Sequence, residues 1–171
     1  MLAEAARFAE RILDTAVGCG AKIATAESCT AGTLATLLAD ARGAGVGFFG
    51  GFIVYSVDAK SELLGVPRDV IRRHTAVSRE VAIAMAAGAL ERCSADIAVS
   101  VTGVAGPEPD EDGNPVGLVH MCVAARNGIR EHREYNFADG ERDALRYRIV
   151  IAALELVETV LTTVQSGTAA R

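Results

Sequence analysis

Apolar positions recur along this chain with two different periods, and these periods predict its secondary structure. From Ala5 to Ala16 they follow helical spacing, which predicts a helix over residues 1–16 that Gly18 and Gly20 end. The same spacing predicts helices over 30–41, over 58–65, from Ser78 through Val81, Met85 and Ala89, and over 143–164. Pro67 suits the start of a further short turn or helix.

Short apolar runs bounded by glycine or polar residues predict strands. They cover residues 22–26 and 48–56, and a further strand within 96–106 runs into a glycine-rich loop. Segments 116–125 and 128–138 form a predicted hairpin that turns near Asn127-Gly128. Strands alternate with helices early and a hairpin comes late. This order predicts a single-domain α/β/α sandwich with a mixed sheet.

Loops and domain limits follow from the same pattern. Residues 43–47 read as a flexible glycine-rich loop, and 107–115 as a polar, turn-rich one. We expect one domain over residues 1–165 and a short flexible tail over 166–171.

Composition narrows the class of protein. A net charge of −5 argues against a large nucleic-acid footprint, which needs a basic face. The cysteines, at positions 19, 29, 93 and 122, show neither C-x-x-C pairing nor zinc-finger spacing, so a reducing compartment fits. The N-terminal stretch is amphipathic and carries acids, unlike a signal peptide, and Glu155 and Glu158 interrupt the most apolar late stretch. We therefore expect a soluble cytoplasmic protein that binds neither nucleic acid nor membrane.

Three loops that follow apolar strands could hold a ligand, namely residues 26–32, 55–60 and 102–106. In the first, Ser28 precedes a predicted helix, where backbone N–H groups favour negative charge. It could attack a carbonyl carbon there, or it could simply cap the helix, which is the commoner role of serine. On this stretch alone the helix cap is favoured.

A nucleophilic serine needs a base, and the sequence offers two kinds. No G-x-S-x-G elbow is present, and His74, His120 and His132 look structural or solvated, so a serine–histidine triad is weakly supported. Lys60 follows Tyr55 by five residues, so both could face one pocket. A desolvated lysine can act as a general base, although a surface lysine on a short helix is equally ordinary.

The remaining candidates are weaker. Cys29 could be a nucleophile, but without a histidine partner a small buried thiol is the preferred interpretation. The stretch "SVTGVAGP" (100–107) offers backbone N–H groups to a phosphate or carboxylate, or forms a plain turn. Glu108, Asp110, Glu111 and Asp112 lack calcium-loop spacing, so we expect a solvated acidic loop.

Together these stretches resemble the C-terminal domain family of the competence/damage-inducible protein CinA, whose stand-alone members include nicotinamide mononucleotide amidases. The stretches that carry the resemblance are "TAESCTAG" (25–32), "GGFIVYSVDAKSELLGV" (50–66), "HTAVSREVAIAMAAGAL" (74–90), "DIAVSVTGVAGP" (96–107), "PVGLVHMCVA" (115–124) and "GERDALRYRIV" (140–150). They lie in order and cover nearly the whole chain.

The resemblance implies a serine amidase that converts nicotinamide mononucleotide to nicotinic acid mononucleotide and ammonia without metal or cofactor. The implied catalytic residues are Ser28, Tyr55 and Lys60, with Lys60 and Tyr55 taking the serine proton. Substrate binding falls on Thr102, Gly103 and Gly106, and Arg142 or Arg146 is a candidate phosphate ligand. From the predicted helix start, we place an oxyanion hole at the backbone amides near Cys29, Thr30 and Ala31.

Three positions depart from the family's usual pattern. Ala31 stands where glycine is usual, Val57 where asparagine is common, and Asn114 where lysine often occurs. These departures leave open an amidase for another small carboxamide, and a non-catalytic nucleotide-binding protein is the alternative from another class. The amino-terminal domain of longer family members is not expected here, so its activity is not transferred. The resemblance also suggests a homodimer.

Overall fold

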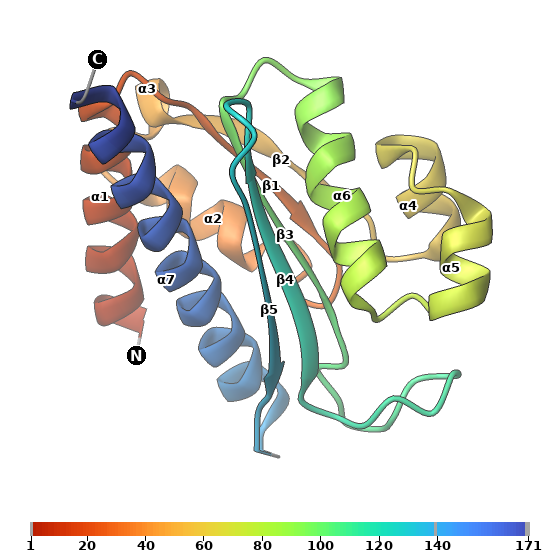
Figure 1. The fold of residues 1–171 in the computed structure, drawn as a ribbon. Helices are drawn as coiled ribbons and strands as arrows, with labels where there is room; N and C mark the ends of the chain where they lie inside the picture. Colours follow the sequence, from red (N-terminus) through yellow and green to blue (C-terminus); the bar gives the residue numbers. More distant parts are fainter. Residues whose placement is uncertain (1, 139, 170–171) are drawn as a thin grey trace.

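The sheet of this protein is mixed, as the sequence predicts. The computed structural model describes residues 2–138 and 140–169. The strands are β1 (Ile23–Glu27), β2 (Phe48–Ile53), β3 (Ile97–Gly103), β4 (Leu118–Ala125) and β5 (Arg130–Asn136). They lie in the order β2-β1-β3-β4-β5. β1 is parallel to β2 and β3, whereas β3–β4 and β4–β5 are antiparallel (Figure 1).

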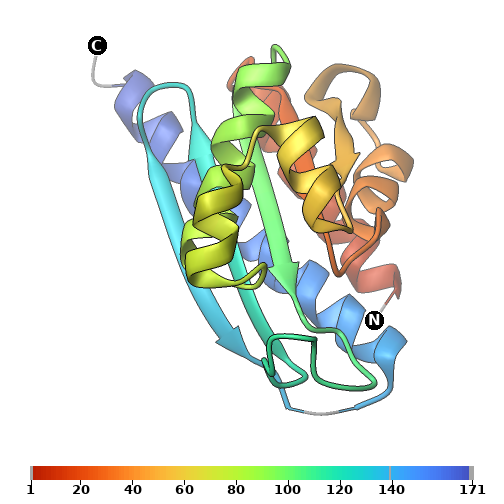
Figure 2. The same cartoon turned by 90° about the vertical axis from the view of Figure 1, so that its right-hand side faces the viewer.

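Helices cover both faces of the sheet and complete the predicted α/β/α sandwich. They are α1 (Leu2–Gly18), α2 (Thr33–Asp40), α3 (Ala44–Gly47), α4 (Val57–Leu64), α5 (Arg68–His74), α6 (Arg79–Arg92) and α7 (Arg142–Ala169). One face carries α1, α2 and α7, and the other carries α4, α5 and α6 (Figures 1 and 2). The structure therefore describes one α/β/α domain.

The two faces of the sheet are packed with side chains of different size. Ile97, Val99 and Val101 of β3 point toward α1, α2 and α7 and join a large aliphatic core. The alternate residues Ala98 and Ser100 face α6, and the Ser100 hydroxyl donates to the Ala82 carbonyl at 2.6 Å. Small side chains on this face let the backbone of α6 lie close to the sheet.

Several element limits differ from the sequence-based expectation. The helix predicted from residue 30 begins at Thr33, and residues 44–47 form the short helix α3 instead of a flexible loop. The strand predicted to residue 56 ends at Ile53. The last helix runs to Ala169, so 166–169 are helical within the segment expected to be a tail, whose residues 170–171 lie outside the described residues.

We predict that Gly88→Ala destabilises the domain by about 2 kcal/mol or more, because extra atoms in a packed interior cost energy. A methyl group at Gly88 of α6 would overlap the Leu64 carbonyl oxygen of α4. The matched control is Gly18→Ala, where no atom lies within 4 Å of the added methyl group. Urea unfolding measures both changes. Equal unfolding midpoints for the two variants would contradict this packing.

Candidate active site

A cavity of about 540 Å³ opens where the three candidate loops meet. β1 and β3 are neighbouring parallel strands and β2 pairs with β1, so the carboxyl ends of all three lie at one edge of the sheet. Most of the predicted site residues line the cavity. These are Ser28, Cys29, Tyr55, Lys60, Thr102, Gly103, Gly106 and Arg142. Thr30, Ala31 and Arg146 are not part of the lining.

Ser28 and Lys60 lie in direct contact at the floor of this cavity. The Lys60 Nζ atom donates to the Ser28 Oγ atom at 2.9 Å, across 32 positions of sequence. It also donates to the backbone carbonyls of Val54 at 3.1 Å and Tyr55 at 3.3 Å. Three acceptors thus hold the amine beside the hydroxyl, and Ser28 is positioned to exchange a proton with it.

Burial changes the acid–base behaviour of this lysine. The Lys60 side chain is only 2% exposed, although lysine is almost never fully buried without a partner. Desolvation lowers its pKa from 10.5 to about 8, because burial penalises the charged ammonium. About a tenth of the amine is therefore neutral at pH 7, and a neutral amine can accept the serine proton.

Local helix capping places Lys60 in the cavity. Ser56 caps α4, since its hydroxyl accepts from the Ala59 N–H at 3.1 Å. The Ser56 carbonyl then accepts from the Lys60 N–H at 3.1 Å in the first turn of the helix. The chain leaves β2, turns once and immediately enters α4, so the lysine side chain reaches back toward Ser28.

Tyr55 stands at the mouth of the cavity. Its side chain is 63% exposed, and it is the Tyr55 backbone carbonyl that contacts Lys60. Among the described residues, the Tyr55 hydroxyl has no hydrogen-bond partner. The predicted proton relay through this hydroxyl remains a prediction.

Glu27 is the residue that the sequence analysis missed. Its side chain is fully buried at the end of β1 and accepts four hydrogen bonds. They come from the Thr25 hydroxyl at 3.1 Å and from the backbone N–H groups of Gly32 at 3.0 Å, Leu34 at 3.1 Å and Ala35 at 2.8 Å. The Glu27 carboxylate therefore caps α2 and closes the turn that carries Ser28.

This cap corrects two expectations about the serine. Ser28 is not the N-cap of α2, because Gly32 holds that position and Glu27 supplies the accepting oxygens. The helix start is thus already occupied by a carboxylate. The Ala31 N–H donates to the Ser28 carbonyl at 3.1 Å and is also taken. Of the amides expected to form an oxyanion hole, only those of Cys29 and Thr30 lack an acceptor among the described residues.

Cys29 is poorly suited to act as the nucleophile. It is buried, and desolvation raises the pKa of its thiol to about 12. The thiolate is the reactive form of cysteine, so this thiol is inert at neutral pH. Its backbone carbonyl accepts from the Arg146 Nε atom at 3.4 Å.

The far wall of the cavity comes from the loop after β3. The Thr102 hydroxyl donates to the Ala76 carbonyl at 2.8 Å, which ties this wall to the segment before α6. Gly103 has no room for a side chain, since an added Cβ would lie 2.7 Å from the Leu118 carbonyl oxygen. Gly106 has φ +78°, a left-handed conformation that favours glycine. The loop therefore presents backbone to the cavity.

The two candidate arginines have different surroundings in the structure. Arg142 is exposed at the start of α7 and lines the cavity. Arg146 lies one turn further along and is half-buried against the Cys29 carbonyl and the Asp143 carboxylate. Of the two arginines, Arg142 is the one that lines the cavity.

The acidic loop belongs to the cavity and not only to solvent. Glu108, Asp110, Glu111 and Asp112 all contribute to the lining, which the sequence analysis had not expected. The Asp110 carboxylate accepts from the Asn114 side chain at 2.8 Å, so Asn114 shapes this loop from behind. Among the described residues, no group of three metal-binding side chains gathers here or elsewhere.

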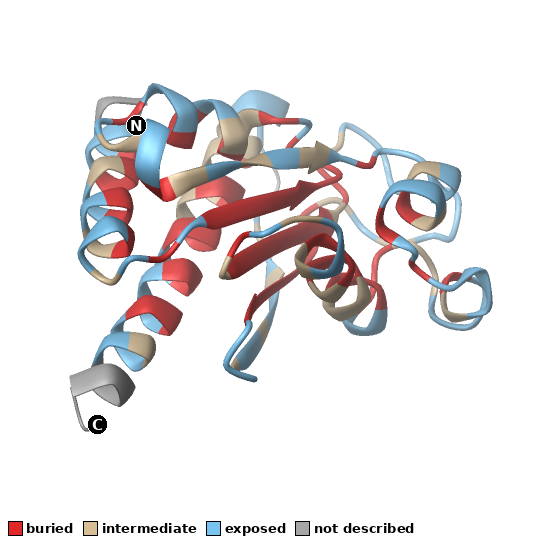
Figure 3. Cartoon of the chain, turned by 90° about the horizontal axis from the view of Figure 1, so that it is seen from above, coloured by how far each residue is buried: buried red, intermediate tan, exposed pale blue. Residues whose placement is uncertain are grey.

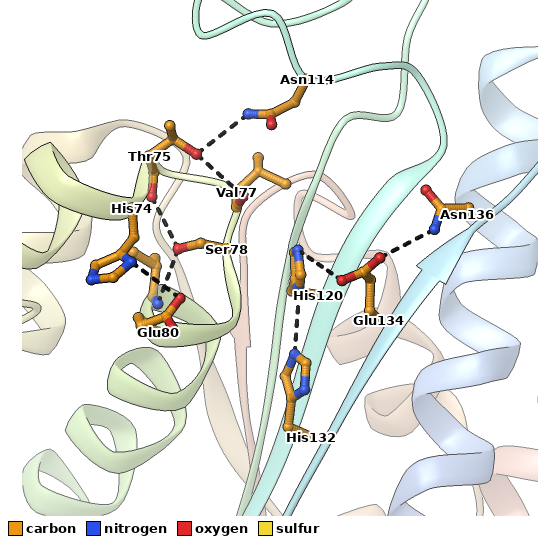
Figure 4. A network of polar contacts seen from close by, with 11 residues as sticks. His74, Thr75, Val77, Ser78, Glu80, Asn114, His120, His132, Glu134 and Asn136 are labelled. Carbon is orange, nitrogen blue, oxygen red and sulfur yellow. Dashed lines mark hydrogen bonds and ion pairs between the residues drawn. The ribbon is translucent and has the colours of Figure 1, made fainter.

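The three histidines lie at the end of α5 (His74), in β4 (His120) and in β5 (His132). Figure 4 shows His120 of β4 against His132 of β5, with 3.2 Å between His120 Nδ1 and His132 Nε2. Burial lowers the pKa of both rings, so they are mostly neutral near neutral pH. His74 pairs with Glu80 at 3.6 Å at the start of α6 (Figure 4). None of the three lines the cavity.

The fold and cavity define a small α/β/α protein with a buried serine–lysine pair. Residues 5–161 match the family model described as the CinA C-terminal domain, and the chain belongs to this family. A CinA-like protein from Mycolicibacterium vanbaalenii is 47% identical over 143 residues, which are 84% of this chain and 34% of that protein. The chain spans about a third of the length of such relatives.

Two further relatives match over most of both chains. The nicotinamide-nucleotide amidohydrolase PncC of Escherichia coli is 40% identical and covers 80% of this chain and 82% of its own length. The crystal structure of the competence/damage inducible protein CihA from Agrobacterium tumefaciens superposes with a TM-score of 0.88 at 40% identity, covering 92% and 95%. Among the described residues, no helix has the length and apolar character needed to cross a membrane.

We predict that Glu27→Gln lowers the free energy of unfolding by about 1–3 kcal/mol. An amide has one accepting oxygen, so in either orientation at least one backbone N–H of residues 32–35 loses its acceptor. The matched control is Glu62→Gln on the exposed side of α4, which leaves the unfolding midpoint unchanged. Chemical denaturation compares the two. Parent-like stability of Glu27→Gln would refute the role of this carboxylate.

Proposed function

We propose that this protein hydrolyses the carboxamide of nicotinamide mononucleotide to nicotinic acid mononucleotide and ammonia, with Ser28 as nucleophile. The single observation that carries the proposal is the 2.9 Å contact between Ser28 Oγ and the buried Lys60 amine, whose pKa is lowered to about 8. The substrate class is supported by the 40% identity to the amidohydrolase PncC over most of both chains.

Acylation begins with neutral Lys60. Ser28 Oγ attacks the carboxamide carbon while the Lys60 amine accepts the hydroxyl proton. The carbonyl oxygen becomes an oxyanion, and the backbone N–H groups of Cys29 and Thr30 supply the hydrogen bonds that stabilise it. The Lys60 ammonium then returns the proton to the amide nitrogen. The carbon–nitrogen bond breaks, ammonia leaves, and an ester links the substrate to Ser28.

Deacylation uses the same groups in reverse. A water molecule enters where ammonia left and gives a proton to Lys60 as its oxygen attacks the ester carbon. The tetrahedral intermediate collapses, the bond to Ser28 Oγ breaks, and the proton passes from Lys60 to Ser28. The product acid releases its remaining proton to solvent and leaves as a carboxylate, and the enzyme is ready for the next turnover. Tyr55, at the cavity mouth, is the proposed partner of Lys60 in these proton transfers.

The remaining lining residues are proposed to hold the nucleotide. Thr102, Gly103 and Gly106 form the wall against which the substrate lies. Arg142 is the proposed phosphate ligand, because a guanidinium matches phosphate geometry and this one faces the cavity. Arg146 instead donates to the Cys29 carbonyl and so supports the turn that carries Ser28.

The three positions that depart from the family pattern lie at different distances from the cavity, and one of them lines it. Ala31 is exposed and outside the cavity lining, so its methyl group does not narrow the pocket of the nucleophile. Asn114 lies behind the acidic loop. Val57 alone of the three lines the cavity. An amidase for another small carboxamide therefore stays as the second candidate, and Val57 is the residue that favours it.

Location and assembly are proposals as well. We place the protein in the cytoplasm, supported by four cysteines that form no disulfide. We also propose that it works as a homodimer.

We predict that the parent protein releases ammonia from nicotinamide mononucleotide without added metal and that Ser28→Ala abolishes this release. The substitution removes the attacking oxygen and leaves the fold intact, which circular dichroism checks. Free nicotinamide serves as the control substrate and should react far more slowly, because it offers no phosphate to Arg142. Equal rates on the two substrates would contradict the nucleotide assignment, and turnover by folded Ser28→Ala would contradict the nucleophile.

A further inference from the structure

The turn that carries Ser28 is buried, yet it holds unpaired polar groups. Figure 3 shows the central strands of the sheet as buried, and residues 28–30, which follow β1, are buried as well. Among the described residues, neither the Thr30 hydroxyl nor the Thr30 backbone N–H has a hydrogen-bond partner. Buried polar groups are almost always paired, and the exceptions often have a catalytic role. Thr30 therefore carries an unpaired donor close to the serine, where negative charge develops during acyl transfer.

Arg146 contacts the same turn from outside the cavity. Its Nε atom donates to the Cys29 carbonyl at 3.4 Å, across 117 positions of sequence. Cys29 lines the cavity and Arg146 does not. The ion-pair partner of Arg146 is the Asp143 carboxylate at 3.5 Å, whose side chain is 87% exposed. Water screens such an exposed partner, so the guanidinium keeps most of its charge beside the turn.

A single peptide group joins Arg146 to the amide of Thr30. The Cys29 carbonyl and the Thr30 N–H belong to the same peptide unit, which is trans. In a planar trans unit the carbonyl and the N–H point in opposite directions, so the Thr30 N–H points away from Arg146. A cation at the carbonyl oxygen draws electron density toward that oxygen and makes the N–H a stronger donor, as in polarised chains of hydrogen bonds.

The positive charge of Arg146 also persists under the conditions in which the site reacts. Burial raises the pKa of the Cys29 thiol to about 12, and the charges of Lys60 and Arg146 oppose this rise, so both reach the turn. Lys60 loses its charge when it becomes the base, whereas a guanidinium stays protonated in proteins. Arg146 is therefore the cation that still acts on the turn while neutral Lys60 accepts the serine proton.

We propose that Arg146 is a positioning residue that polarises the Cys29–Thr30 peptide group and so makes the Thr30 N–H the main donor to the oxyanion. This role rests on the proposed serine mechanism and assigns different tasks to the two arginines. Arg142 binds the substrate, whereas Arg146 acts on the transition state. Because the oxyanion forms only as Ser28 attacks, Arg146 increases kcat and leaves KM unchanged.

Two substitutions of Arg146 separate its charge from its hydrogen bond. Arg146→Lys keeps the charge, and Arg146→Gln keeps a hydrogen-bonding amide without the charge. The matched control is Arg148→Gln on the same helix, because the Arg148 guanidinium also donates to a backbone carbonyl, that of Ala138 at 2.8 Å, and does not line the cavity. Circular dichroism confirms that each variant is folded.

The first measurement is the kinetics of ammonia release from nicotinamide mononucleotide. We expect kcat of Arg146→Gln to fall about tenfold or more at unchanged KM, a part of the roughly 100–1,000-fold that loss of a whole oxyanion-hole donor costs. Arg146→Lys should lie between Arg146→Gln and the parent, and Arg148→Gln should match the parent. Parent-like kcat in folded Arg146→Gln, or a higher kcat in Arg146→Gln than in Arg146→Lys, would overturn the role. So would Arg146→Lys with a raised KM and the kcat of the parent.

The second measurement detects the polarised peptide group without any reaction. In a two-dimensional nitrogen–proton NMR spectrum, the Thr30 amide nitrogen should move upfield in Arg146→Gln and less far in Arg146→Lys, because less electron density is drawn from this nitrogen. Arg148→Gln should leave it in place. An unmoved Thr30 resonance would overturn the proposal. A shifted resonance in a protein whose parent form releases no ammonia would count against the proposed reaction and leave the polarised peptide group standing.

Discussion

The contact between the Lys60 amine and the Ser28 hydroxyl is the interaction on which the candidate site depends. A buried ammonium is costly, and here three oxygen acceptors within 3.3 Å offset part of that cost. The remaining cost appears as the lowered pKa of Lys60. The burial that destabilises the charged lysine thus makes it useful as a base, because it raises the neutral fraction beside a hydroxyl that must lose a proton.

The rest of the fold holds these two atoms together across 32 positions of sequence. The Glu27 carboxylate fixes the turn that carries Ser28, and the Ser56 cap fixes the helix that carries Lys60. Both turns follow paired parallel strands, so the sheet sets their separation. Small residues on the α6 side bring the Ala76–Ser78 segment close enough for Thr102 to bind it, which closes the opposite wall.

Much of this was predictable from sequence because it depends on local pattern. The alternation of strands and helices, followed by a hairpin, predicted the mixed sheet. The loops that follow the strands predicted the position of the cavity. Contacts between distant residues were not predictable in this way. The Glu27 carboxylate accepts from backbone N–H groups five to eight positions later, and the residues around Glu27 do not predict this contact. The one available signal is an acidic residue at the end of a strand, shortly before a glycine-containing turn. Likewise, Arg142 and Arg146 lie one turn apart on the same helix, so the sequence does not distinguish them. Only the packing of α7 against the rest of the domain decides which one faces the cavity.

The central claim is that neutral Lys60 activates Ser28, and covalent labelling with a fluorophosphonate tests it without any assumption about substrate. The hydroxyl oxygen attacks phosphorus, fluoride leaves, and Lys60 takes the proton. Mass spectrometry of the labelled peptide locates the adduct. The account predicts labelling at Ser28 with a rate that rises about tenfold per pH unit below 8 and levels off above it, since the base must be unprotonated. It also predicts loss of labelling in folded Lys60→Met. A rate independent of pH, an adduct on another residue, or undiminished labelling of Lys60→Met would contradict it.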